Sequence, residues 1–179
     1  MGQTLSDTEV KPRAVTPRRT GVLWVLTVSA VALHNVEEWL LGLTGWIADH
    51  PWLPGRFLHG NHVQFAIALA MVTAVVLVIA LIAVATRARW SEGVLVSVAY
   101  ALMINAGSHL VLSVLSWSLM PGTFSAALLL LPLGLLIERS LPVVHWTATS
   151  LVLTIVATVG LVIGSLAAAA GIGATLGVQ

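Results

Sequence analysis

The chain has no cysteine among its 179 residues, and it has few charges. The missing thiols exclude disulfide bonds and thiolate metal ligands, and leave the redox environment undetermined. Charged residues make up 8% of the chain, whereas a soluble domain carries about 25%. Hydrophobic residues make up 58%, and the mean hydropathy is +1.00. This composition excludes a soluble globular domain and is that of an integral membrane protein.

The apolar residues fall into five runs, each long enough for a membrane-crossing helix or nearly so. We therefore predict an all-α polytopic membrane protein, a bundle of five transmembrane helices near residues 21–43, 62–86, 92–119, 123–137 and 143–170. Residues 1–20 are polar and are predicted to be a disordered cytoplasmic tail. Residues 21–179 then form a single transmembrane helical domain. The fourth run is short and contains Pro132, which predicts a kinked, tilted or sunken span.

The distribution of positive charge predicts the orientation. With five alternating spans, one side holds seven Lys and Arg residues and the other holds only Arg56; the seven are Lys11, Arg13, Arg18, Arg19, Arg87, Arg89 and Arg139. Because Lys and Arg concentrate in cytoplasmic loops, we expect the N-terminus inside and the C-terminus outside, in a bacterial inner or cell membrane.

Three ionisable residues, His34, Glu37 and Glu38, interrupt the first apolar run. A carboxylate near the middle of a membrane helix costs about 2.5–3.5 kcal/mol even on the forgiving insertion scale. His34 lies three and four residues before the two glutamates, so all three are expected on one face of the helix. This cost favours a functional role over charges that merely reach the headgroups.

Other helices are expected to bring polar residues to the same depth. At about 1.5 Å per residue, His34 lies roughly 20 Å above the inner start of its span, and Asn105 and His109 lie roughly 20 and 25 Å above theirs. Asn105, His109 and Ser113 form an i, i+4, i+8 stripe. The second span runs the other way and begins at this outer level with Asn61, His62 and Gln64, and with His59 if the helix starts early.

Two chemistries fit this set. Two neighbouring carboxylates in a water-poor site resist double ionisation, so Glu37 and Glu38 can act as acid and base. His34 and His109 would relay protons, and Asn105 would orient a polar group. Alternatively, His34, Glu38, His62 and His109 offer nitrogen and oxygen ligands suited to zinc or iron. The spacing differs from the Glu-x-x-His arrangement of ferritin-like di-metal bundles, which weakens the metal alternative.

The string His34-Asn35-Val36-Glu37-Glu38, followed by Asn105-x-x-x-His109 and by Pro121-Gly122-Thr123, resembles the HXXEE-domain family of bacterial integral membrane proteins. This resemblance implies a small multi-span protein with suspected enzymatic activity, but no particular reaction. A looser similarity is to the glutamate-dependent intramembrane CAAX-type proteases. Their Glu-Glu-x-x-x-Arg pattern fails here because Gly42 stands at the arginine position.

We therefore expect a membrane enzyme that acts on a lipophilic, isoprenoid-like substrate from the outer leaflet by isomerisation, cyclisation or hydrolysis. Its partners would be membrane lipids and this substrate, not nucleic acid. The rivals are a proton or divalent-cation transporter, which needs a polar route to the inner side, and a non-catalytic membrane subunit. Gly160 and Gly164 form a G-x-x-x-G motif, which predicts close helix packing inside the bundle or in a homo-oligomer.

Overall fold

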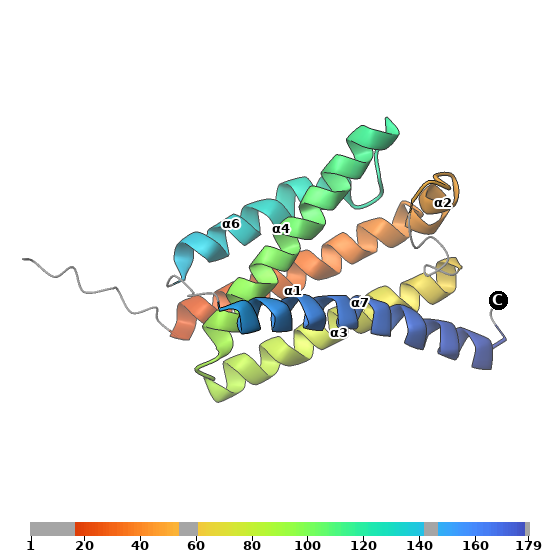
Figure 1. Cartoon of the computed structure of the whole chain (residues 1–179). Helices are drawn as coiled ribbons and strands as arrows, with labels where there is room; N and C mark the ends of the chain where they lie inside the picture. Colours follow the sequence, from red (N-terminus) through yellow and green to blue (C-terminus); the bar gives the residue numbers. More distant parts are fainter. Residues whose placement is uncertain (1–16, 54–60, 142–146, 178–179) are drawn as a thin grey trace, which may run out of the picture.

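The computed structural model describes residues 17–53, 61–141 and 147–177, and these residues form helices and turns without a strand (Figure 1). Helix α1 spans Pro17–Leu40 and is followed by a short helix α2, Leu43–Ala48. Helices α3, His62–Thr86, and α4, Ser91–Ser116, come next. The three-residue α5, Thr123–Ser125, continues through a π-helix, Ala126–Leu130, into α6, Leu131–Ser140; α7 is Ala148–Thr175.

Five helical stretches are long and apolar enough to cross a membrane, as the sequence predicted; they are Arg18–Leu40, His62–Thr86, Ser91–Ser116, Thr123–Ser140 and Leu151–Thr175. Several predicted ends differ from the observed ones by three residues, and the differences are larger at the start of α1 and at both ends of α7. Helix α1 begins at Pro17, within the predicted tail, because proline suits the first turn of a helix, where no backbone N–H has a partner. Helix α7 starts and ends about five residues later than predicted. Residues 1–16, Arg56, His59 and His145 lie outside the described ranges.

The fourth span contains the π-helix instead of continuous α-helix. Pro132 is the second residue after the π-helix, and its ring would clash with the carbonyl of Leu128 in a regular α-helix. Leu128 lies within the π-helix Ala126–Leu130, so the wider turn includes this carbonyl. Single π turns of this kind often occur beside functional sites.

The bundle is divided into two groups of helices around α1. Helix α3 packs against α1 and also against α7, while α4 packs against α6 (Figure 1). The largest core cluster fills the half of the bundle where α1 begins, and includes Leu23, Trp24, Leu95, Leu130 and Ile137. Trp24 Nε1 donates a hydrogen bond to Ser91 Oγ at 2.8 Å, which ties α1 to the start of α4.

Helix α7 packs through a different set of small residues from the one predicted. Ser165, Ala169 and Gly173 are buried at a four-residue spacing, and a Cβ on Gly173 would lie 2.7 Å from Gln64 Nε2 on α3. Around Gly160 and Gly164 nothing in the described chain lies within 4 Å of where a Cβ would be. The G-x-x-x-G motif therefore makes no helix contact inside the described bundle.

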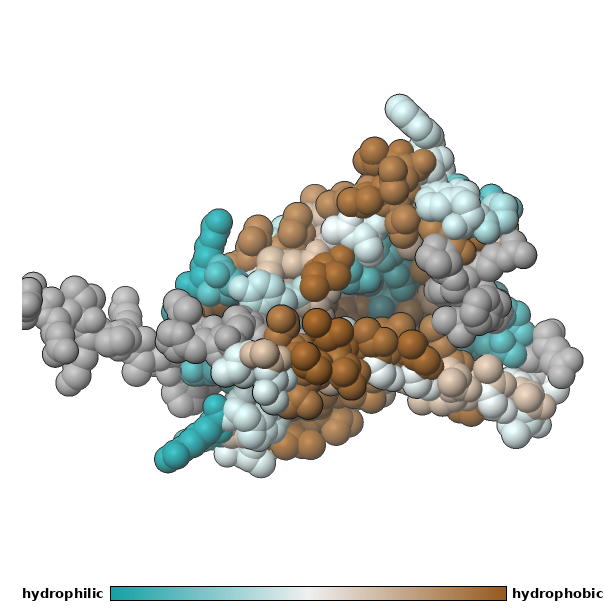
Figure 2. All heavy atoms as spheres, viewed as in Figure 1, coloured by the Kyte–Doolittle hydropathy of each residue, from teal (hydrophilic) through white to brown (hydrophobic). Residues whose placement is uncertain are grey.

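The surface has the banding of a membrane protein. Figure 2 shows a broad hydrophobic region across the middle of the molecule and hydrophilic residues toward both ends. Helices α4 and α7 diverge from the end where α7 begins (Figure 1). In the space-filling view the surface is hollowed in this region, with hydrophilic atoms at the floor of the hollow (Figure 2).

Candidate functional site: a buried His-Glu-His cluster

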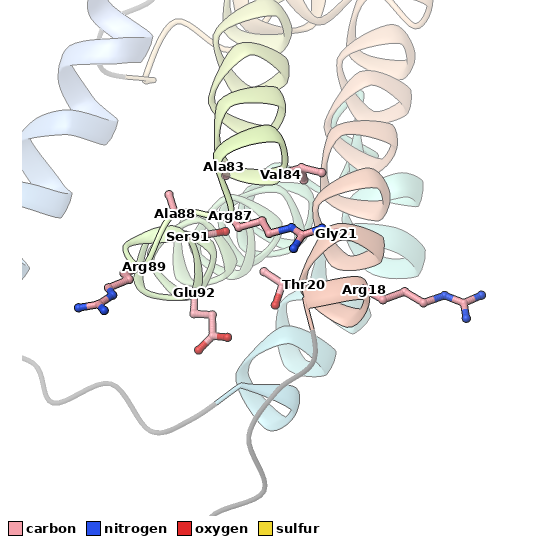
Figure 3. Close-up of a pocket in the computed structure, with 10 residues that line it drawn as sticks. All are labelled: Arg18, Thr20, Gly21, Ala83, Val84, Arg87, Ala88, Arg89, Ser91 and Glu92. Carbon is pink, nitrogen blue, oxygen red and sulfur yellow. The ribbon is translucent and has the colours of Figure 1, made fainter.

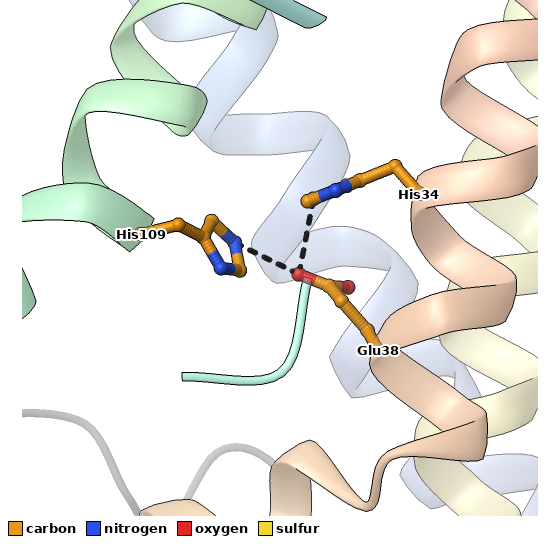
Figure 4. A group of neighbouring side chains, drawn as sticks. All are labelled: His34, Glu38 and His109. Atoms are coloured by element: carbon orange, nitrogen blue, oxygen red, sulfur yellow. Dashed lines mark ion pairs between the residues drawn. The ribbon is translucent and has the colours of Figure 1, made fainter. Parts of the chain in front are cut away.

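Glu38 of α1 lies between two imidazole rings. Its Oε1 is 3.3 Å from His34 Nε2, one turn earlier on the same helix, and 3.0 Å from His109 Nε2 on α4 (Figure 4). All three residues are buried, with exposures of 3% for His34, 7% for Glu38 and 2% for His109. The two rings meet edge to face, with centroids 4.8 Å apart. Three ionisable side chains are thus gathered in the interior of an apolar bundle.

Two polar side chains orient the His34 ring. Its Nδ1 lies 2.9 Å from Ser125 Oγ, and its Nε2 lies 2.9 Å from Asn105 Nδ2. The Ser125 hydroxyl donates to the Gly122 carbonyl at 3.2 Å, so its lone pairs are free to accept the His34 Nδ1–H. We therefore assign the proton to Nδ1 and a lone pair to Nε2, which points at Asn105 and Glu38.

The second imidazole has an unpartnered nitrogen. His109 Nε2 donates to Glu38 Oε1 at 3.0 Å, and His109 Nδ1 is buried without a hydrogen-bond partner in the described part of the chain. A buried polar atom without a partner costs about 1–3 kcal/mol. Such an atom in a native fold calls for an explanation beyond packing.

The turn between the third and fourth spans closes over the cluster. Gly122 has a φ of +93°, and a Cβ there would lie 2.8 Å from His109 Cε1 and 2.9 Å from both Glu38 Cγ and His34 Cε1. Only glycine tolerates this backbone conformation and leaves room for the three side chains. The backbone of the turn is therefore in direct contact with the cluster.

Ser113 holds this turn in place. Its hydroxyl accepts a hydrogen bond from the Met120 backbone N–H at 2.9 Å and lies 2.8 Å from Thr123 Oγ1. Ser113 is the third member of the predicted stripe with Asn105 and His109. It supports the wall of the cluster and does not join the cluster itself.

Glu37 does not share the pocket with Glu38. Its carboxylate accepts hydrogen bonds from the backbone N–H groups of Phe124, at 3.1 Å, and Ser125, at 2.7 Å. Gly122, the N-cap of α5, provides no side-chain cap, so Glu37 caps the fourth span from a neighbouring helix. This corrects the prediction of a paired acid and base, because adjacent helical residues point about 100° apart.

The polar residues at the start of α3 also lie elsewhere. The His62 ring is exposed and stacks on Trp39, with centroids 5.4 Å apart. Asn61 and Gln64 form a capping box at the start of α3. The structure therefore brings together His34, Glu38, His109 and Asn105 of the predicted set and leaves His62 and Glu37 outside. A group of three residues with ligand atoms within 4.8 Å of one another comprises His34, Glu38 and His109.

Gly122 and Ser125 belong to the site, although the sequence analysis gave them no role in it. The signal for Gly122 was present, since a Pro-Gly turn joins the third and fourth spans at the same depth as His109. Ser125 carried no comparable signal. Serine is common at the start of helices, and only the packing of α1 against the fourth span places it at His34.

A separate basin lies at the opposite end of α1 (Figure 3). It has a volume of about 610 Å³ and is lined by Arg18, Thr20, Gly21, Ala83, Val84, Arg87, Ala88, Arg89, Ser91 and Glu92. Gly21 is about 20 Å from His34 along the helix. The Arg87 side chain extends across the basin toward Gly21, whereas those of Arg18 and Arg89 point outward (Figure 3). The residues that line the basin include no histidine, whereas the buried cluster joins two histidines to a carboxylate, so we place the candidate site at the cluster.

The comparisons with known proteins give a family and no further match. Residues 24–137 match the family described as protein of unknown function with HXXEE motif. This range contains every residue of the buried cluster and ends before α7. No curated protein and no solved structure matches the chain. Because the match covers more than half of the sequence and includes His34, Glu37 and Glu38, the chain belongs to the HXXEE family.

Proposed function

We propose that the protein is a membrane-embedded enzyme that acts on a lipophilic, isoprenoid-like substrate by acid-base chemistry at Glu38, His34 and His109. The observation that carries this proposal is the burial of a carboxylate between two imidazoles inside an apolar bundle. Ionisable groups in membrane spans are expensive, so their concentration at one point indicates use.

The arrangement supports proton transfer in both directions. Glu38 is the residue that can take a proton from a substrate carbon or from a water molecule and, once protonated, give it back at another atom. His109 Nε2, 3.0 Å away, donates a hydrogen bond to this carboxylate and stabilises its charge. His34 is held by Ser125 and Asn105, so its ring is fixed when charge develops. Removal and return of a proton can move a double bond, which is isomerisation, or start ring closure onto a double bond, which is cyclisation. The same groups can activate water for hydrolysis.

An opening between α4 and α7 supports a substrate taken from the membrane. Thr154 of α7 contacts Ser97 of α4 at 3.4 Å, and at the other end Leu112 and Leu166 pack against the same cluster of apolar residues. Asn105 lies eight residues after Ser97 and seven before Leu112, on the same face of α4. Asn105 is partly exposed and contacts His34, so we propose that a substrate between α4 and α7 reaches the site through Asn105.

The inner half of the bundle argues against transport. Below His34 and Asn105 the buried side chains of α1 and α4 are mainly apolar, and include Ala30, Val31, Ala99 and Leu102. Thr27 is buried there, but its hydroxyl donates to the Leu23 carbonyl at 2.8 Å. A proton or cation path would need polar groups through this region, whereas a one-sided pocket does not.

The orientation belongs to the same proposal. Arg18, Arg87 and Arg89 line one basin, and Arg139 is in the last turn of α6, which ends at the same end of the bundle (Figure 1). The positive-inside rule places this end in the cytoplasm of a bacterial cell. The cluster then lies in the outer half of the membrane, and α7 ends outside.

A comparison of lipid products tests the enzyme proposal. The full chain and its Glu38→Gln variant would be reconstituted in nanodiscs with a lipid extract from the expression host and from isoprenoid-rich bacteria, and products followed by untargeted mass spectrometry. Glutamine keeps the size of the side chain but removes the proton-transfer group, so product formation should fall by about 100-fold or more. Glu92→Gln, in the inner basin, serves as the control and should leave product formation unchanged.

Two results would contradict the proposal. One is a product that forms equally with the wild type and with Glu38→Gln, while Glu38→Gln is folded by size-exclusion chromatography and thermal unfolding. The other is no wild-type product from any extract, including extracts to which linear and cyclic isoprenoids have been added.

A homo-oligomer through Gly160 and Gly164 remains part of the proposal for partners. These glycines have open space around them in the described chain, so the face is available to a second copy. Replacing both by leucine should convert an oligomer into a monomer in crosslinking within native membranes. A wild type that is monomeric there, or an oligomer that survives the replacement, would remove this part.

A further inference from the structure

The electrostatics of the cluster carry a second inference, which concerns what lies between the three side chains. The assigned His34 tautomer directs the Nε2 lone pair toward Glu38 Oε1, 3.3 Å away. Glu38 Oε1 also faces His109 Nε2 at 3.0 Å. The Asn105 amide can donate one N–H to the His34 Nε2 lone pair, and His109 Nε2 can donate to Glu38 Oε1. Neither hydrogen bond puts a proton between His34 Nε2 and Glu38 Oε1, and in an apolar interior the repulsion between these two electron-rich atoms is only weakly screened.

The two distances from the Glu38 carboxylate are compatible with the first coordination shell of a metal ion. Zinc binds histidine nitrogen and carboxylate oxygen at about 2.0–2.2 Å in a tetrahedron, so neighbouring ligand atoms are about 3.3 Å apart. The two measured separations from Glu38 Oε1 are 3.0 and 3.3 Å. All three ligand atoms lie within 4.8 Å of one another. Two histidines and one carboxylate are also the ligand set of known catalytic zinc and non-haem iron sites.

The surroundings of His34 have the form of a second coordination shell. A metal-bound histidine usually donates its other N–H to an oxygen atom, which fixes the tautomer and the ring. His34 Nδ1 has this relation to Ser125 Oγ at 2.9 Å. Ser125 is fixed in turn, because its backbone N–H donates to Glu37 at 2.7 Å. Glu37 thus supports the proposed ligand through Ser125 and is not itself a ligand.

We propose that His34 Nε2, His109 Nε2 and Glu38 bind one divalent transition-metal ion, Zn²⁺ or Fe²⁺, with the His109 proton moved from Nε2 to Nδ1 when the ion is bound. Three protein ligands leave a coordination position open for water or substrate. Asn105 lies 2.9 Å from His34 Nε2 and is partly exposed, so it is placed to contact a molecule in that position. His62, a ligand in the sequence prediction, is outside this site.

The metal site uses the residues of the proposed enzyme but does not depend on catalysis. Metal-free, the cluster is the acid-base unit described above. With a metal bound, His34, His109 and Glu38 would hold the ion, which would supply Lewis-acid activation of a water molecule or substrate in the open position. Metal content and product formation are separate measurements, so either proposal can fail without the other.

Metal analysis of the purified full chain tests the inference. Protein would be prepared in mild detergent without chelators and titrated with Zn²⁺ or, under anaerobic conditions, with Fe²⁺. Bound metal would then be measured by inductively coupled plasma mass spectrometry. We expect about one ion per chain, and a drop in affinity of more than about 100-fold in Glu38→Gln and His109→Gln. His62→Gln and Glu92→Gln are matched controls and should bind as the wild type does.

Cobalt provides a readout that misfolding cannot imitate. Co²⁺ bound by nitrogen and oxygen ligands in a four- or five-coordinate site gives visible absorption bands, which the wild type and both controls should show and His109→Gln should lack. The proposal is overturned if the wild type stays metal-free after titration with all three ions. It is equally overturned if a folded His109→Gln or Glu38→Gln binds the ion as tightly as the wild type.

Discussion

At the scale of single residues, helix geometry gives two adjacent glutamates different partners. Glu38 is four residues after His34 and therefore faces the same way, whereas Glu37 points about 100° from Glu38. Glu38 contacts the two imidazoles, and Glu37 contacts the exposed backbone N–H groups at the start of the fourth span. One short motif thus supplies the carboxylate of the buried cluster and also the cap that positions Ser125.

This division of roles predicts the effect of Glu37→Ala. The variant leaves the N–H groups of Phe124 and Ser125 without their carboxylate, and loss of a helix N-cap costs about 0.5–2 kcal/mol. We expect the free energy of unfolding to fall by about 2 kcal/mol, measured by denaturant titration in detergent. Glu138→Ala, an exposed position on α6, is the control, and an equal effect there would contradict the capping role.

Gly122 gives a second prediction at this scale. In Gly122→Ala the new Cβ would press on His34, Glu38 and His109 at a backbone conformation that alanine disfavours. We expect a loss of stability of about 3 kcal/mol, from overpacking and backbone strain together. Gly107→Ala, on α4 with nothing within 4 Å, should change the melting temperature little. If both variants melt with the wild type, the turn does not close on the cluster.

At the scale of elements, the sequence predicts much of the fold because burial in lipid demands long apolar helices. Five spans follow from hydropathy and length alone. The ends of α1 and α7 do not, because helix ends depend on local backbone partners outside the apolar run. The π-helix beside Pro132 also needs the packed structure, since a proline alone predicts only a disturbance.

The site shows the same limit. Spacing along one helix predicts that His34 and Glu38 share a face and that Asn105 and His109 do too. It does not say which residues of another helix they meet, so Ser125 and Gly122 emerge only from the structure. His62 was predicted as a possible ligand only because of its expected depth in the membrane. In the structure its ring stacks on Trp39 and does not join the cluster.

The packing of α7 leads to a prediction with a built-in control. Gly173 is buried against Gln64, whereas Gly160 on the same helix has open space around it. Gly173→Leu should therefore separate α7 from α3 and lower stability by about 1–3 kcal/mol, while Gly160→Leu should be nearly neutral in the monomer. Thermal unfolding of both variants measures the difference. A larger loss for Gly160→Leu would mean that α7 packs through its other face.

At the scale of the whole molecule, polar chemistry is separated along the membrane normal. The His-Glu-His cluster occupies one half of the bundle, an apolar core fills the other half, and arginines line the basin beyond it. This asymmetry fits a centre that exchanges material with one side only. The orientation of the chain therefore decides which leaflet supplies the proposed substrate.

The absence of cysteine makes this orientation directly measurable. Single cysteines would be introduced at exposed positions, with Trp90→Cys at the turn before α4, Leu119→Cys in the turn after it and Leu176→Cys after α7. Because positive charge is retained in the cytoplasm, a membrane-impermeant maleimide added to intact spheroplasts should label the cysteines at 119 and 176 and spare the one at 90. Lysis should make all three reactive.

Labelling at 90 alone would mean that the protein has the opposite orientation and that the cluster lies in the inner leaflet. Labelling that separates 119 from 176 would show that the last span does not cross, and the five-span arrangement would then be wrong.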